Sequence, residues 1–206
     1  MVGWIRLWAV IAINKKAMNL KDSRQIFMKV LILGIGNILF GDEGIGVHLS
    51  NYLKVNYAFK SSAHSLQIID GGTLAQGLIP LITENDFVIL IDCINADNAK
   101  IGDVFAFDFN AVPINVNWQG TAHEVEMLQT LKMIEMLGDL PTIKIVATIP
   151  HILDSDTTFE LSQTIKKSAM TMRDEVFAHL KNLGFEIEKI ADRDLQDIAN
   201  LSYKGF

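Results

Sequence analysis

Strand-length apolar runs alternate with helix-like patterns from Met28 onward, and this order constrains the fold more than any other feature of the chain. Each run is almost continuously apolar, as strands buried on both faces of a sheet are. The runs cover residues 29–36, 66–71, 87–93, 104–109 and 143–149. Strands that alternate with helices form βαβ units with a parallel sheet. We therefore predict a three-layer α/β/α sandwich around a mostly parallel sheet of these five strands.

Amphipathic patterns between the apolar runs predict helices at residues 45–57, 74–82, 123–137 and 158–183. Gly184 is placed to end the last helix. Asp156 or Thr157 is placed to cap its start, with Glu160 available for a capping box. Pro113, Gly120 and several amide side chains predict a loop at residues 111–121. The polar tail after Gly184 contains a weak strand pattern at residues 185–190, to which we assign no function.

Length and composition favour one globular domain, at residues 28–206. A chain of 206 residues, half of them apolar, buries about 70% of its unfolded surface as a single domain. The net charge of −6 and the absence of a basic cluster argue against nucleic acid as a partner. Cys93 is the only cysteine, which excludes an internal disulfide and a multi-cysteine metal site. A reducing cytoplasm is the expected compartment.

Residues 1–27 require a separate interpretation. Their apolar run, residues 7–13, lies between Arg6 and Lys15 and is far shorter than the about 20 residues that span a bilayer. A signal peptide would carry its positive charge before the apolar run and small residues at a cleavage site. We therefore expect a non-targeting extension, from a start codon assigned too early, and no stable membrane insertion. A short amphipathic helix on a partner or membrane surface is the alternative.

The most informative segment is residues 34–46, GIGNILFGDEGIG, which closes the first strand and opens the first helix. A dinucleotide-binding turn would have glycine or alanine where Leu39 stands. A P-loop would continue after Gly41 with lysine and serine or threonine, where this chain has Asp42 and Glu43. Carboxylates repel phosphates, so the segment predicts a cation site or an acid–base role. The alternative is that the glycines only allow close packing and the acids only favour the helix N-terminus. For Asp42 we prefer the role of a helix cap.

Two further acids lie at the ends of predicted strands. Asp70 stands in the sequence DGGT, and Asp92 follows the apolar run 87–91. Ligands of parallel sheets bind at the carboxyl ends of strands, so Glu43, Asp70 and Asp92 should converge on a surface crevice at one edge. Asp70, before two glycines, also fits a turn residue. Asp92 fits that role less well, and Cys93 should point the opposite way, into the core.

His123 is the best histidine candidate, because it follows a polar loop and opens a helix at the same edge. His151, after the fifth strand, is the second choice. The other histidines are interpreted as surface or packing residues: His48 and His179 in helices, and His64 in a loop. Glu43, Asp92 and His123 together would form an oxygen-rich site with one imidazole, which suits a borderline divalent cation.

In this order and spacing, the motifs resemble those of the hydrogenase maturation proteases. The resemblance covers residues 28–183 and rests on GxGNxLxxDEGxG at residues 34–46, on DGGT at 70–73, on Asp92 and on His123. The family commonly has proline and glutamine around the histidine, where this chain has Ala122 and Glu124. This difference concerns the entry into the helix and leaves the imidazole in place.

The resemblance implies an α/β/α endopeptidase that removes a C-terminal peptide from the nickel–iron hydrogenase large-subunit precursor after nickel insertion. It also implies that Glu43, Asp92 and His123 contact nickel that belongs to the substrate. Nickel would polarise the scissile carbonyl or activate water, with Asp42 or Asp70 as the base. We expect a cytoplasmic monomer.

Two alternatives remain open at this point. A non-catalytic nickel-binding or escort protein would use the same ligands, and only cleavage of the precursor distinguishes it. A Rossmann-type oxidoreductase is disfavoured by Leu39 and would be excluded by a failed nucleotide titration.

Overall fold

The central element of the molecule is a five-stranded sheet with strand order β3-β1-β4-β8-β6. The computed structural model describes residues 27–112, 116–117, 122–151 and 157–206. β1, β3, β4 and β8 are parallel, and β6 pairs antiparallel with β8. The strands span Met28–Ile35 (β1), His64–Gly72 (β3), Phe87–Cys93 (β4), Val104–Asp108 (β6) and Thr142–Thr148 (β8). Their positions confirm the predicted mostly parallel sheet.

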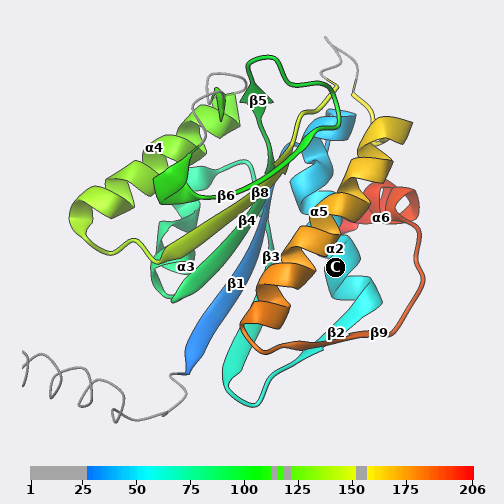
Figure 1. Ribbon diagram of the computed structural model, residues 1–206. Coiled ribbons are helices and arrows are strands. Elements are labelled where there is room, and N and C mark those ends of the chain that lie inside the picture. Colours follow the sequence, from blue (N-terminus) through cyan, green and yellow to red (C-terminus); the bar gives the residue numbers. More distant parts are fainter. Residues whose placement is uncertain (1–26, 113–115, 118–121, 152–156) are drawn as a thin grey trace, which may run out of the picture.

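Helices cover both faces of this sheet, which confirms the three-layer sandwich (Figure 1). One face carries α2 (Ile45–Asn56), α5 (Gln163–Asn182) and α6 (Leu195–Leu201); the other carries α3 (Ile79–Thr83) and α4 (Ala122–Leu137). Each face has its own apolar core. Leu49 and Met172 pack in the first core, and Ile82 and Leu131 in the second. Among the described residues, no helix is long and apolar enough to cross a membrane.

The central strand β4 contributes side chains alternately to the two cores. Ile89, Ile91 and Cys93 lie in the core under α2 and α5, whereas Val88 and Leu90 lie in the core under α4. By the same alternation, Asp92 belongs to the α4 side of the sheet. The expected burial of Cys93, opposite Asp92, is confirmed.

The predicted helix at residues 158–183 begins later than expected. α5 starts at Gln163, and its cap is Ser162, whose side chain accepts a hydrogen bond from the Ile165 N–H. The prediction of Thr157 as the cap was wrong, because Thr158 instead forms a parallel β-bridge with Phe40 in the loop after β1. Asp156 lies outside the described residues. Gly184 follows the helix end in a left-handed conformation, with φ +82°, as expected.

Two other predicted segments also differ in detail. The helix expected at residues 74–82 is split into a 3-10 turn, η2 (Ala75–Leu78), and the short α3. The loop expected at residues 111–121 begins inside a 3-10 turn, η3 (Phe109–Ala111), and contains β7 (Val116–Asn117). β7 pairs antiparallel with β5 (Asn95–Ala96), which closely follows β4.

The C-terminal tail is more structured than the sequence pattern indicated. β9 (Glu186–Lys189) pairs antiparallel with β2 (Tyr57–Lys60). α6 was not predicted, although a cap and helical spacing mark it: Asp194 accepts a hydrogen bond from the Gln196 N–H. Its residues Leu195 and Ile198 are buried in the core that also contains residues of α2 and α5. The chain then ends through a 3-10 turn, η4 (Ser202–Lys204).

Candidate active site

The turn between β1 and α2 is packed closely against the carboxyl ends of the central strands. It contains the 3-10 turn η1 (Gly41–Gly44), which carries Asp42 and Glu43. A Cβ at Gly46 would lie 2.1 Å from the Ile35 carbonyl oxygen and 2.2 Å from that of Ile91. Glycine is therefore required where α2 begins, so the interpretation of this glycine as a packing residue is supported.

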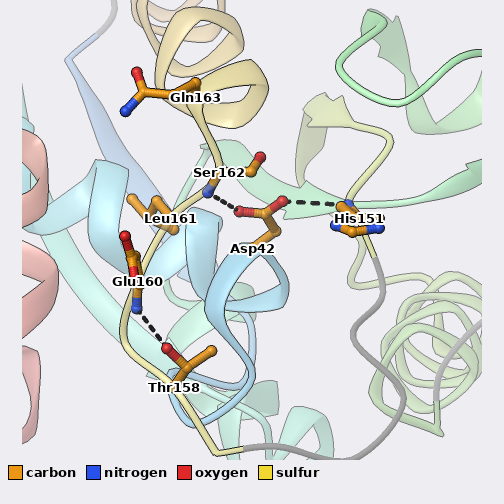
Figure 2. A pocket seen from close by; sticks show the side chains of 7 residues that line it. All are labelled: Asp42, His151, Thr158, Glu160, Leu161, Ser162 and Gln163. Carbon is orange, nitrogen blue, oxygen red and sulfur yellow. Dashed lines mark hydrogen bonds between the residues drawn. The ribbon is translucent and has the colours of Figure 1, made fainter.

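Asp42 does not cap the helix N-terminus, so that interpretation was wrong. Neither η1 nor α2 has a side-chain cap. The Asp42 carboxylate reaches across to two loops: Oδ1 accepts a hydrogen bond from the Ser162 N–H at 2.8 Å, and Oδ2 accepts one from the His151 N–H at 3.3 Å (Figure 2). With only 3% of its surface exposed, Asp42 ties the turn to the chain after β8.

A cleft of about 260 Å³ opens beside Asp42. Figure 2 shows its lining, which comes from the turn, from the chain just after β8, from residues 158–162 and from the start of α5. The lining residues are Asp42, His151, Thr158, Glu160, Leu161, Ser162 and Gln163. His151, the second-choice histidine, is exposed and belongs to this lining. The cleft offers hydroxyl, amide, imidazole and carboxylate groups to a polar ligand or a peptide.

Glu43 is buried, with 9% of its surface exposed, and burial raises the pKa of its carboxyl group. Its backbone carbonyl oxygen lies 3.9 Å from the Cys93 Sγ. Glu43 is thus next to the end of β4. Burial disfavours the charged form of this carboxyl group, and a nearby cation would favour that form.

Asp92 is completely buried at the end of β4, with 0% of its surface exposed. Its Oδ1 accepts a hydrogen bond from the Cys93 N–H at 2.8 Å. The expectation that the strand-end acids line an open surface crevice was therefore wrong for Asp92 and Glu43. The closely packed turn and the elements around the strand ends exclude solvent from both.

His123 is the second residue of α4, and its side chain lies outside the described part of the structure. Its backbone follows β7, which pairs with β5 just after Asp92. His123 thus enters α4 near the strand ends, and α4 covers the face to which Asp92 belongs. Among the side chains that the structure describes, no group of three or more His, Cys, Asp or Glu residues could hold a metal ion. The three-residue site stays a prediction.

Asp70 is the exposed member of the acidic set. It lies near the end of the edge strand β3, and its Oδ1 accepts a hydrogen bond from the Gly72 N–H at 3.0 Å. The Gly72 carbonyl oxygen in turn accepts a hydrogen bond from the Gly36 N–H at 3.0 Å. This hydrogen bond supports the alternative interpretation of Asp70 as a turn residue, and the turn is joined to the loop after β1.

Of the other histidines, His48 and His64 form hydrogen bonds within the fold. His48 is fully buried in α2, and its Nδ1 lies 2.8 Å from the Ser202 Oγ. His64 lies in β3, not in a loop as expected, where its Nδ1 accepts a hydrogen bond from the Met28 N–H. His179 lies in α5. The sequence interpretation did not identify Ser162, whose backbone N–H is the nearer partner of Asp42.

Comparisons with known proteins agree with this architecture. A family model described as "Hydrogenase maturation protease" matches residues 47–179. "Protein HydD" of Wolinella succinogenes is 56% identical over 160 residues, which are 78% of this chain and 100% of that protein. The "Hydrogenase 2 maturation protease" of Escherichia coli is 27% identical over 160 residues, 77% of this chain and 94% of that one. The solved structure of the hydrogenase maturating endopeptidase HybD from E. coli is similar with a TM-score of 0.66 and 25% identity, over 81% of this chain and 100% of that chain.

Proposed function

Because this chain belongs to the hydrogenase maturation protease family, we propose that it removes the C-terminal peptide of the nickel–iron hydrogenase large-subunit precursor after nickel insertion. The nickel would belong to the precursor, which is the substrate. Glu43, Asp92 and His123 would contact it in the precursor. Three protein ligands leave coordination positions open for the substrate's own donors, so recognition would depend on the metal being present.

The observation that best supports this proposal is the burial of two carboxyl groups at the carboxyl ends of the central strands. Glu43 and Asp92 are 9% and 0% exposed, and the Glu43 backbone contacts Cys93, the residue after Asp92. Burying carboxylates is costly unless they are paired or bind a cation. A buried carboxyl group with a raised pKa, such as that of Glu43, is typical of functional sites. A nickel ion presented by the precursor would compensate for the poor solvation of Glu43.

The accessibility of the remaining acids favours Asp70 over Asp42 as the base. A general base must reach the proton that it removes. Asp42 is 3% exposed, and both of its oxygens accept backbone hydrogen bonds. Asp70 is exposed, and its turn is hydrogen-bonded to the loop after β1. We assign the structural role to Asp42 and the proton-transfer role to Asp70.

The test uses a nickel-loaded and a nickel-free precursor, with the mass of the product as the measurement. Only the nickel-loaded precursor should be shortened. Glu43→Gln, Asp92→Asn and His123→Ala should each abolish cleavage, and Asp70→Asn should slow it if Asp70 is the base. Asp86→Asn is the matched control, because Asp86 flanks the opposite end of β4 and accepts a hydrogen bond from the Lys29 N–H.

Circular dichroism of each variant controls for folding, which is essential because Asp92 is buried. Full activity of a folded Glu43→Gln or Asp92→Asn variant would contradict the metal-contact assignment. Equal trimming of both precursors would contradict nickel recognition but would leave the proposed protease activity standing. A chain that binds the loaded precursor and leaves it uncut would be an escort protein.

We further propose that the enzyme acts as a monomer in the cytoplasm, to which its single, buried Cys93 is suited.

A further inference from the structure

Residues 158–162, here called the strap, run alongside the turn that carries Asp42 and Glu43. The Thr158 N–H donates to the Leu39 carbonyl oxygen at 2.9 Å, and the Gly41 N–H donates to the Thr158 carbonyl oxygen at 2.8 Å. At the other end of the strap, the Ser162 N–H donates to the Asp42 Oδ1 at 2.8 Å. The turn and the strap are therefore held together at both ends.

On its other side, the strap is hydrogen-bonded to a side chain of α6, that of Gln196. The Gln196 Oε1 accepts a hydrogen bond from the Leu161 N–H at 2.9 Å, and the Gln196 Nε2 donates to the Phe159 carbonyl oxygen at 2.9 Å. The amide thus satisfies one backbone donor and one backbone acceptor, as a neighbouring β-strand would. The Nε2 also lies 3.0 Å from the Asn200 Oδ1, which helps to orient the amide.

A second contact joins the same C-terminal segment to the same turn. Ser202, just after α6, lies with its Oγ 2.8 Å from the His48 Nδ1. The His48 ring in turn lies against Gly44, because a Cβ at Gly44 would be 2.6 Å from the His48 Nε2. The end of the chain thus supports η1 from two directions, through the strap and through His48.

We propose that Gln196 is a positioning residue, which fixes the strap and thereby the turn that carries Asp42 and Glu43. The inference rests on the proposed function of Glu43 in the site. Without Gln196, the backbone groups of Phe159 and Leu161 lose their partners and the strap can move away from α6. Asp42 then loses its fixed Ser162 donor, and the adjacent Glu43 loses its fixed position. Gln196 lies outside residues 47–179, which match the family model.

The test is Gln196→Met, which keeps the length of the side chain and removes both hydrogen bonds to the strap. We expect kcat for precursor cleavage to fall about tenfold and KM to stay within about twofold, because a misplaced site group affects the chemical step more than substrate binding. Two variants serve as controls. Asp194→Ala removes the cap of α6 without removing the strap contacts, and Asn200→Ala removes only the side-chain partner of Gln196.

The comparison separates positioning from simple stabilisation of α6. A tenfold lower kcat in Gln196→Met, with Asp194→Ala near wild type at an equal or larger loss of thermal stability, supports the proposal. Equal kcat losses in Gln196→Met and Asp194→Ala would overturn it, as would a change in KM alone or no change. Amide hydrogen exchange is the second measurement and needs no activity. The Leu161 and Ser162 amides should exchange at least about tenfold faster in Gln196→Met than in Asp194→Ala, and equal rates would overturn the proposal even if the wild type cuts no precursor.

Discussion

The buried imidazole of His48 should make the stability of the protein depend on pH. The Ser202 hydroxyl donates to the Ile198 carbonyl oxygen, so its oxygen is available to accept a hydrogen bond from the His48 Nδ1–H. The Nε2 is then the unprotonated nitrogen, and it is buried without a hydrogen-bond partner among the described residues. Protonation would place a charge there, and burial accordingly lowers the pKa of His48 from 6.5 to about 4.

The sign and size of the effect follow from linkage. In the unfolded chain the imidazole takes up a proton near pH 6.5, whereas in the folded protein it stays neutral down to about pH 4. The stabilising contribution of neutral His48 is therefore complete above the unfolded pKa and is lost as the pH falls from 6.5 towards about 4. Each pH unit between the two pKa values corresponds to about 1.4 kcal/mol, which gives a total of about 3 kcal/mol. About 2 kcal/mol of this is lost by pH 5.

The assay is urea unfolding of the wild type and of His48→Asn at pH 7.5 and pH 5. Asparagine keeps a donor for Ser202 and does not titrate. The free energy of unfolding of the wild type should fall by about 2 kcal/mol more than that of the variant. Both chains carry His179 and Glu43, whose shifted pKa values also contribute, so their effects cancel in the difference. The same pH dependence in both chains would refute the assignment of a neutral, buried His48.

Three further outcomes can be measured. A chain that begins at Met28 should fold and cleave precursor like the full chain, because residues 1–27 supply no predicted core or site; loss of soluble expression or of activity would show that they dock or stabilise. Isothermal calorimetry with NAD, FAD and ATP should give no heat of binding, because Asp42 and Glu43 stand where a phosphate loop needs neutral or cationic donors; micromolar affinity for any of them would revive a nucleotide-dependent function. Gly46→Ala should lower the free energy of unfolding in urea by about 3 kcal/mol or prevent folding, because its Cβ would meet two backbone oxygens, whereas Gly77→Ala should change it little, because nothing lies within 4 Å of a Cβ there; similar effects of the two changes would be inconsistent with close packing at Gly46.

Part of what the sequence interpretation missed was within reach of local rules. Between Cys93 and Val104 the chain is too short for the crossover of a dozen or more residues that a parallel strand needs, so the reversed direction of β6 could have been expected. Likewise, Asp194 before Leu195 and Ile198 carries the cap and the spacing of a short helix. Both features involve only residues that are close together in the sequence.

The partners of Asp42 were out of reach of such rules. Ser162 and His151 lie 120 and 109 residues further along the chain, and both donate through backbone N–H groups that every residue except proline possesses. The sequence therefore does not show which backbone donors will bind Asp42. The contacts of Gln196 with Phe159 and Leu161 are of the same kind.

The layers, the central strands and the edge of the sheet at which Glu43, Asp70 and Asp92 lie could all be predicted from the sequence. Buried strands and amphipathic helices have recognisable patterns of apolar and polar residues, and ligands of parallel sheets bind at the carboxyl ends of the strands. The hydrogen bond of Asp42 to the strap, in place of a helix cap, and the burial of Glu43 and Asp92 follow from the tertiary packing. These features depend on how segments far apart in the chain pack against one another. The packing pairs backbone N–H and C=O groups, which are chemically alike at almost every position, so the sequence does not reveal which groups will pair.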